Sequence, residues 1–564
     1  MMLVLGWAPP AVAQTLEVFQ IQGAGMSSPY AGATVTTNAN VVTAVGTEGF
    51  FIQTPDSRDD GNPNTSNGIY VADVSPEVEV GFLVDVTGVV EEFFDWTQLH
   101  DPEVTLRSTG FALPAQVAFD EATPAPNQPW PAHELERFEG MRVRVADGTV
   151  TAPTDGFGDA CIVAKPGRVF REPGISYPGL PGLPVFDGNP EAFRIAPGGL
   201  TGAETGLVAG ASFSAEGVLA YEFGEYRLWP TELVVTAAPV APRSVRLRRT
   251  GEISVATQNL ERLDAAQSDP PFVHRLAKLS GQIREVLGSP DVVAVQEVQD
   301  VVSLSALADR IRADDPAARY TAVHREGPWQ DGFDVGFLVR DTMVVDWVEQ
   351  IGADVIFSYD GSLLNDRPPL VLEVSSTYTD PAFQFTVIAV HQRSLRNIDD
   401  PDDGDRVRRK RHEQSVWLAN WLQQRQTIRP EERLIVAGDF NAFEFTDGYV
   451  DVMGSVTGAP DSEGALIPAV DVVDPPLTDT ARLLGEEDRY TYVFDCDAEV
   501  LDHIVVNNAL QPWLAAVSVS RGNADAPEGW AANPDTAARS SDHDGVVVYL
   551  GARWRRPSGR RLTP

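Results

Sequence analysis

Cysteine and long apolar runs are both scarce in this chain of 564 residues. Its two cysteines, Cys161 and Cys496, are too few for a disulfide framework and too far apart for a zinc motif. They are either two unrelated thiols or one bridge formed in an oxidising compartment. No apolar stretch reaches the length of about 18 residues that a transmembrane helix needs, so no membrane span is predicted.

Positive charge is also scarce. The chain has 43 Lys and Arg against 81 Asp and Glu, which gives a net charge of −38 and a pI near 4.5. Only Lys165, Lys278 and Lys410 are lysines. This composition argues against a protein that coats polyanions with a basic surface.

The remaining composition is that of a folded protein with several domains. Hydrophobic residues make up 43% and charged residues 22%, which leaves enough apolar material for a core and excludes global disorder. Because domains average roughly 150 residues, a chain of this length is expected to contain more than one.

Changes in composition and in apolar patterning along the chain predict its domain organisation. An apolar start and the small-x-small pattern Ala11-Val12-Ala13 indicate the remnant of an export signal that lacks a positive N-terminal region. Short apolar alternations between Gly, Pro and Asn turns then predict strands. The predicted parts are an export-signal remnant (1–13), an OB-like β domain (14–115), a second β-rich region (116–236), a linker (237–250), a catalytic domain (251–551) and a basic tail (552–564).

After Glu252, strand and helix patterns alternate. Apolar periodicity predicts helices over Val273–Leu287, Val302–Ile311 and Val407–Gln424, with strands such as Val292–Val295 and Leu434–Ala437 between them. Mixed order over about 300 residues is typical of a layered α/β or α+β catalytic domain.

Polar residues cluster where the predicted strands end. Such placement aims carboxylates, amides and imidazoles from rigid strand ends into one cleft. Any one of these residues is ordinarily a turn, a cap or a satisfied core group, but six clusters in one domain predict a hard-cation site of oxygen ligands. The residues are Asn259, Glu297, His391, Asp439 with Asn441, Asp502, and Asp542 with His543.

The order and spacing of these clusters closely resemble the endonuclease/exonuclease/phosphatase superfamily. The resemblance runs from about Glu252 to Leu550, and Gly438–Asp447 is similar to secreted bacterial extracellular nucleases. Strings in the first module, such as Thr65–Val71, resemble the OB-like domain that precedes the nuclease in that branch. The implied fold class is α+β, with a four-layer α/β/β/α sandwich after a β-rich OB-like region.

The resemblance also implies roles for the clustered residues. Glu297, Asp542 and Asn259 would hold Mg²⁺ or Mn²⁺ at the scissile phosphate. Asp439 and Asn441 would orient the attacking water and a phosphate oxygen. The remaining implied roles are proton transfer or hydrogen bonding by His391 and His543, orientation of His543 by Asp502, and phosphate binding by Arg367 with Asn441.

The implied function is a secreted, metal-dependent nuclease that acts on DNA and could also act on RNA, without an obligate protein partner. Two alternatives stay open: a sphingomyelinase-like or other phosphate-ester hydrolase on the same fold, and a non-catalytic extracellular binding protein. Within the resemblance, Gln258 departs from the aromatic residue that usually precedes the asparagine.

Two weaker features complete the sequence. The run Arg406–Arg411 opens an amphipathic helix whose basic face could contact a DNA backbone or pair with nearby acids. The oxygen-rich loops Asp56–Asn64 and Asp399–Asp405 could hold structural Ca²⁺, although neither has an EF-hand pattern.

Overall fold

The computed structural model describes residues 13–73, 77–127, 134–176, 179–180, 182–202, 206–328, 332–379, 381–461 and 463–551. These form two compact units. One contains the described residues of Met1–Val169 and Asp187–Pro239, and the other those of Phe170–Phe186 and Val240–Pro564. Positions 1–12 of the predicted export signal and the predicted basic tail lie outside the described residues. None of the described helices has the length and apolar character needed to cross a membrane.

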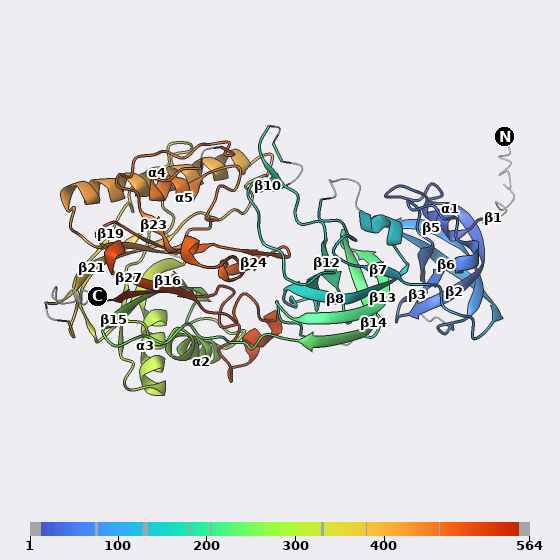
Figure 1. Ribbon diagram of the computed structural model, residues 1–564, viewed down its shortest axis with the longest axis horizontal. Coiled ribbons are helices and arrows are strands. Elements are labelled where there is room, and N and C mark those ends of the chain that lie inside the picture. The colour runs from blue at the N-terminus through green and yellow to red at the C-terminus, as the bar shows by residue number, and fades with distance from the viewer. Residues whose placement is uncertain are drawn as a thin grey trace, which may run out of the picture. The chain divides into compact units, whose positions relative to one another are not determined.

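A closed β-barrel makes up the start of the first unit (Figure 1). Its sheet has the order β1-β2-β3-β4-β6-β5, and an additional β2–β5 pairing closes it. Strands β4 and β6 pair in parallel. The bounds are β1 (Gln14–Thr15), α1 (Val18–Gln22), β2 (Thr34–Val45), β3 (Gly49–Gln53), β4 (Gly68–Ala72), β5 (Leu83–Phe93) and β6 (Trp96–Ser108).

The second barrel repeats this topology. Its order is β13-β14-β12-β9-β8-β7, closed by β13–β8, and β12 and β14 pair in parallel as β4 and β6 do. The bounds are β7 (Val117–Phe119), β8 (Arg142–Ala152), β9 (Ala160–Val163), β12 (Ala192–Ile195), β13 (Ser212–Glu222) and β14 (Glu225–Ala237). The sequence shows no short-period repeat, so the two barrels share a strand order without an evident repeat in residues.

Two six-stranded sheets form the centre of the second unit. The first has the order β17-β18-β16-β15-β28-β27 and the second β19-β20-β21-β22-β26-β23. The first sheet contains β15 (Glu252–Leu263), β16 (Val292–Val298), β17 (Tyr320–His324), β18 (Asp334–Arg340), β27 (Leu514–Val519) and β28 (Val546–Gly551). The second contains β19 (Met343–Gln350), β20 (Leu370–Ser376), β21 (Gln384–His391), β22 (Leu434–Asp439), β23 (Thr478–Asp479) and β26 (Asp502–Val506).

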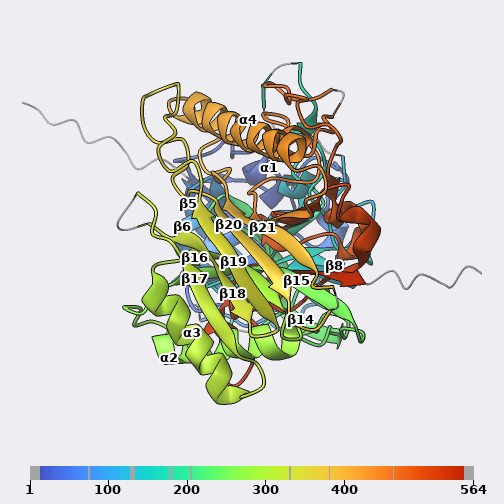
Figure 2. The same cartoon turned by 90° about the vertical axis from the view of Figure 1, so that its left-hand side faces the viewer.

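Apolar side chains of the two sheets meet in one core, which includes Val255, Phe337, Leu372 and Ile435. Helices cover both outer faces (Figure 2). The first sheet is covered by α2 (Phe272–Gly281), which continues as a π-helical turn (Gln282–Val286), and by α3 (Val301–Asp314). The second is covered by α4 (Gly404–Ile428) and α5 (Val452–Thr457). The predicted α+β class with a four-layer α/β/β/α sandwich after a β-rich region is confirmed.

Short elements complete the described chain. The strand pairs β10 (Ile175–Ser176) with β11 (Val185–Phe186), and β24 (Tyr492–Phe494) with β25 (Asp497–Glu499), both belong to the second unit. The 3₁₀ turns are Asp56–Arg58, Glu134–Phe138, Thr480–Leu483, Glu486–Asp488, Gln511–Trp513 and Glu528–Ala532.

The segment Phe170–Phe186 leaves the second barrel and packs into the second unit. Ile175 is fully buried in the core formed with α4 and β22. At Gly448, whose φ of +88° suits glycine, a Cβ atom would lie 2.3 Å from the Ile175 side chain. The segment therefore belongs to the packed core of the sandwich unit and is not only a linker.

Candidate functional site

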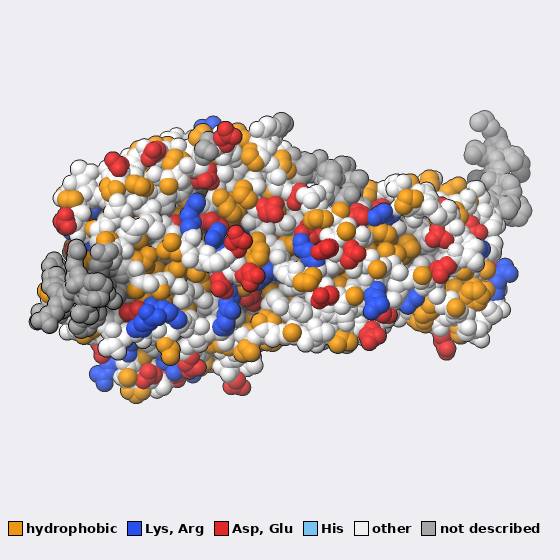
Figure 3. Space-filling model, in the orientation of Figure 1, with side chains coloured by type: hydrophobic (Ala, Val, Ile, Leu, Met, Phe, Trp, Pro, Cys, Tyr) orange, Lys and Arg blue, Asp and Glu red, His pale blue; other side chains and the backbone are white. Residues whose placement is uncertain are grey.

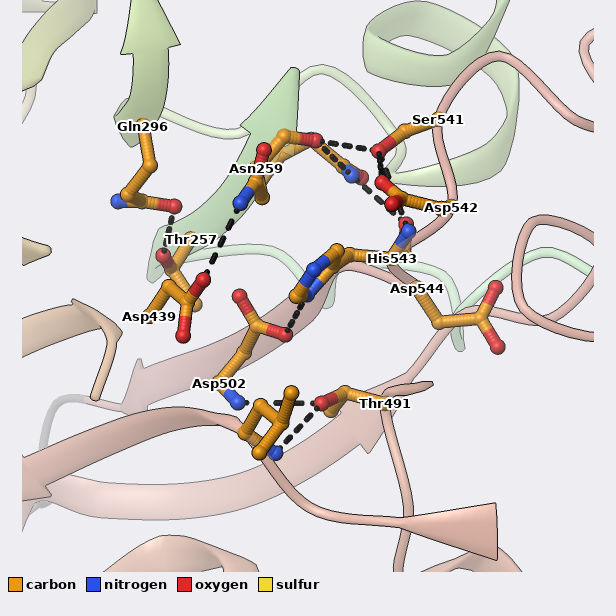
Figure 4. A network of polar contacts seen from close by, with 12 residues as sticks. Thr257, Asn259, Gln296, Asp439, Thr491, Asp502, Ser541, Asp542, His543 and Asp544 are labelled. Atoms are coloured by element: carbon orange, nitrogen blue, oxygen red, sulfur yellow. Dashed lines mark hydrogen bonds and ion pairs between the residues drawn. The ribbon is translucent and has the colours of Figure 1, made fainter. Parts of the chain in front are cut away.

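The polar clusters predicted at strand ends meet at one edge of the two sheets (Figure 4). His391 at the end of β21 is in register with Asp439 at the end of β22, and Asp439 is in register with Asp502 at the start of β26. In the other sheet, Asn259 of β15 is in register with Gln296, the residue before Glu297. The edge thus collects carboxylate, amide and imidazole groups from five strands.

The Asp502–His543 pair lies at the centre of this group. His543 Nδ1 lies 2.7 Å from Asp502 Oδ2, and both side chains are buried. Burial is the largest single effect and opposes the charged imidazole, but the carboxylates of Asp502, Asp542 and Asp439 together outweigh it and hold the pKa of His543 well above its usual value. The ring is fixed from its other side by Tyr492, whose centroid lies 4.6 Å away.

Asp439 lies beside this pair. Its Oδ1 accepts from the Asn441 backbone N–H at 2.8 Å, and its Oδ2 accepts from Asn259 Nδ2 at 3.2 Å. His391 Nε2 lies 3.4 Å from Asp439 Oδ2. Burial raises the pKa of Asp439 to about 7 and, with repulsion from Arg367, holds the pKa of His391 well below its usual value.

Buried polar atoms at this site lack partners. Neither Asp502 Oδ1 nor His391 Nδ1 has a hydrogen-bond partner among the described residues, and Gln296 Nε2 has none either. Such groups are costly to bury without a partner, and their concentration here indicates a place where water or a polar ligand binds.

Negative charge gathers on one side of the site. Asn259 Nδ2 lies 3.4 Å from Glu297 Oε1, and burial together with the charges of Asp542 and Glu297 raises the pKa of Glu261. No group of three or more His, Cys, Asp or Glu side chains in the described ranges has the arrangement of a complete metal site. Two partly exposed carboxylates and an amide do fit a hydrated Mg²⁺, which needs only one or two protein carboxylates.

The backbone at the site is strained. Glu261, Glu297 and Asn441 have φ values of +48°, +61° and +47°, in the left-handed region that non-glycine residues rarely adopt. Residues held in this way cluster at functional sites, where the surrounding structure enforces them.

Arg367 contributes a positive charge to the site. It interacts electrostatically with Glu297 and Asp439, although burial is the larger effect and lowers the pKa of its guanidinium. All nine residues predicted for the site therefore lie in one neighbourhood.

Several site residues were missed by the sequence analysis. The Gln258 amide donates to the backbone oxygens of Asn259 and His543 at 2.8 and 2.9 Å, which explains a polar residue at that position. Arg275 and Lys278 of α2 bind backbone carbonyls of the loop before His543. Lys278 is one of three lysines in the sequence, but it lies off the apolar side chains that predict this helix, so the pattern carries no signal for this contact.

The basic run on α4 is paired with acids rather than free. Its partners include Asp405 for Arg409, Asp366 for Lys410 and the buried Asp447 for Arg411. On the face shown in Figure 3, basic and acidic side chains are interspersed rather than gathered into a stripe. In the oxygen-rich loops, Asp59, Asp60 and Asp400 accept from backbone amides of their own loops.

Solved structures match about half of this chain. The solved structures that match include the endonuclease/exonuclease/phosphatase from Bacteroides vulgatus, with 16% identity over 53% of this chain and 98% of that chain and a TM-score of 0.35. A humanized D. rerio TDP2 matches with 19% identity over 54% and 100% of the chains and a TM-score of 0.34. The human Nocturnin catalytic domain with bound sulfate matches with 17% identity over 54% and 96% and a TM-score of 0.34. No curated protein matches the chain.

Family models cover most of the chain after residue 133. A model described as a domain of unknown function (DUF8508) matches residues 134–239, and the endonuclease/exonuclease/phosphatase model matches residues 256–543. The second match spans every site residue from Asn259 to His543 and supports hydrolysis of phosphodiester bonds. The chain belongs to the endonuclease/exonuclease/phosphatase family.

Proposed function

We propose that the protein is an exported, metal-dependent nuclease that hydrolyses phosphodiester bonds of DNA by attack of water on phosphorus. The observation that carries this proposal is the buried Asp502–His543 pair, with 2.7 Å between Oδ2 and Nδ1, next to Asp439 and Asn441. A histidine fixed by a carboxylate is a group that moves or donates protons near neutral pH.

Glu297, Asp542 and Asn259 would hold the divalent cation, Mg²⁺ or Mn²⁺. When bound, this ion neutralises charge on the scissile phosphate. The position of this cation is supported by the repulsion between nearby carboxylates. Besides burial, the charges of Asp542 and Glu297 raise the pKa of Glu261. A cation removes that repulsion.

The other side chains act on water and phosphate. Asp439 and Asn441 would orient the attacking water and a phosphate oxygen, with the Asn441 amide held by the backbone oxygen of Gln392 at 3.1 Å. His543 and His391 would donate hydrogen bonds or protons to the phosphate. Arg367 would bind a phosphate oxygen through its planar fork, as its position near Glu297 and Asp439 supports.

Export is supported by the cysteines. Cys161 and Cys496, the two cysteines of the sequence, are both disulfide-bonded. Disulfides persist in oxidising compartments and are rare in the cytosol. The strand order of both barrels, with five strands closed and the third and fifth parallel, supports the OB-like interpretation of the β-rich region.

Purified protein incubated with plasmid DNA, RNA and sphingomyelin vesicles, each with Mg²⁺, Mn²⁺ or EDTA, tests the proposal. We expect plasmid cleavage with either metal and none with EDTA. Cleavage of sphingomyelin with intact plasmid contradicts the substrate proposed, and inactivity on all three substrates contradicts an enzymatic function.

A further inference from the structure

A cavity of about 410 Å³ lies in the second unit beside the catalytic cluster. Four segments line it: Phe170–Glu172, Phe443–Phe445, the turn that contains Glu486 and Arg489, and the end of β25 at Glu499. The first of these lies outside the part of the chain matched by the nuclease family model.

One wall of this cavity is connected to His543 through Tyr492. Glu499 pairs with Tyr492 across the β24–β25 hairpin, and the Tyr492 ring packs on the His543 ring. On another wall, Phe443 follows Asn441 by two residues. A group in the cavity would therefore lie next to a phosphate held at His543.

Aromatic rings form much of the lining. The Phe443 and Phe445 rings lie 5.6 Å apart, and the Arg171 guanidinium lies 4.8 Å from the Phe443 centroid. Arg171 is held by the backbone oxygens of Glu172 and Gly174, so its plane is fixed. The guanidinium also lies 4.0 Å from the Phe186 centroid, so the partly exposed Phe445 ring is the surface on which a planar ligand can stack.

Glu499 supplies a buried polar group to the lining. Its side chain faces the cavity although the residue is only 7% exposed. Burial raises the pKa of Glu499 to about 8, although Arg171 opposes the shift. A buried carboxyl that lines a cavity is available to a ligand with N–H donors, which would satisfy its oxygens.

The charge of the lining selects against a second phosphate. Carboxylates outnumber guanidinium groups, and the charged lining residues are Glu172, Glu444, Glu486, Glu499, Arg171 and Arg489. A neutral planar ligand with N–H donors suits this lining better than an anion. Carboxyl oxygens accept from the exocyclic amino groups of bases, as they do from cytosine N4.

We propose that this cavity binds the base of a nucleotide adjoining the scissile phosphate, with a preference for bases that carry an exocyclic amino group. This inference rests on the proposed nuclease function. The segment Phe170–Phe186 then contributes to substrate selection, because Arg171 forms one wall and the backbone N–H of Arg171 binds Ala498 O at 3.0 Å beside Glu499.

Oligonucleotides with a single cleavable phosphodiester among methylphosphonates test this proposal. The nucleotide on one side of that bond carries cytosine, thymine or no base, and a second series varies the other side. With Mg²⁺, we expect kcat/KM for cytosine to exceed that for the abasic substrate about ten-fold on one side, with thymine between them.

Two variants separate the contributions. Phe445→Ala should remove most of the advantage of both bases over the abasic substrate. Glu499→Leu should remove only the preference for cytosine over thymine. Phe494→Ala removes an aromatic ring that is 63% exposed on the neighbouring hairpin, and it should leave both ratios unchanged.

Equal kcat/KM for cytosine and abasic substrates in the wild type overturns the proposal, as does a uniform loss on all substrates in Phe445→Ala. Absence of all cleavage contradicts the proposed function instead. In that case, fluorescence anisotropy titrations of the same oligonucleotides in EDTA decide the inference: equal affinity for cytosine and abasic oligonucleotides overturns it, and tighter binding of cytosine that is lost in Phe445→Ala supports it.

Discussion

Replacing Lys278 with methionine should loosen the loop that carries Asp542 and His543. The buried Lys278 ammonium lies within 3.0 Å of four backbone carbonyl oxygens of that loop, and methionine keeps the apolar stem but removes every donor. The carbonyls belong to Trp530, Asn533, Thr536 and Ala538.

The expected cost follows from the burial of these carbonyls. A buried acceptor left without a partner costs about 1–3 kcal/mol. Ala538 is buried, whereas Trp530, Asn533 and Thr536 are partly or fully exposed and can recruit water. We therefore expect the free energy of unfolding to fall by on the order of 2–4 kcal/mol. A displacement of about 1 Å at His543 should lower kcat by about 10²-fold.

Urea unfolding and initial rates of plasmid cleavage, measured where the variant is fully folded, check this prediction. Lys165→Met is the matched control because Lys165 is partly exposed and pairs with Glu191 in the first unit. It also lowers the free energy of unfolding, because it leaves the buried Glu191 carboxylate without its partner, but it should leave kcat unchanged. If Lys278→Met unfolds and reacts like the wild type, the loop does not depend on this ammonium.

Three further predictions concern single buried groups. Asp502→Asn should lower kcat by about 10²–10⁴-fold without unfolding the protein, because His543 loses the carboxylate that orients it; steady-state kinetics at a wild-type rate contradict this role. Arg411→Met breaks the buried pair with Asp447 and should lower the free energy of unfolding by about 3–5 kcal/mol in a urea titration, so an unchanged midpoint refutes it. Burial raises the pKa of Glu499 from 4.5 to about 8, so the folded protein holds this proton more tightly than the unfolded chain. The stabilisation from the protonated Glu499 carboxyl is complete below pH 4.5 and is lost as the pH rises through 8, and the loss is on the order of 5 kcal/mol. Glu499→Leu should abolish this pH dependence of the free energy of unfolding. Equal pH dependence in the wild type and the variant contradicts the prediction.

The polar residues clustered at strand ends could be predicted because their signal is local. A carboxylate one residue beyond an apolar run, as at Asp439 or Glu297, marks both the strand and the end from which the side chain projects. Parallel pairing of β21 with β22 then brings His391 and Asp439 together without any further information.

Contacts between segments that are far apart in the sequence have no such local signal. Lys278 and Trp530 are 252 residues apart, and nothing in the amphipathic pattern of α2 indicates that a loop supplies carbonyls to its lysine. The Pro- and Gly-rich composition of Phe170–Phe186 predicts a loop, but not its packing in the sandwich unit. The shared strand order of the two barrels is likewise a property of pairing, which residue periodicity does not encode.

The most direct test of the central claim is the rate of plasmid cleavage in Mg²⁺ by the wild type and by His543→Ala. The buried imidazole at 2.7 Å from Asp502 should account for a loss of at least about 10²-fold in His543→Ala, and EDTA should abolish cleavage by the wild type. Cleavage by His543→Ala at the wild-type rate, or by the wild type in EDTA, contradicts hydrolysis at this site.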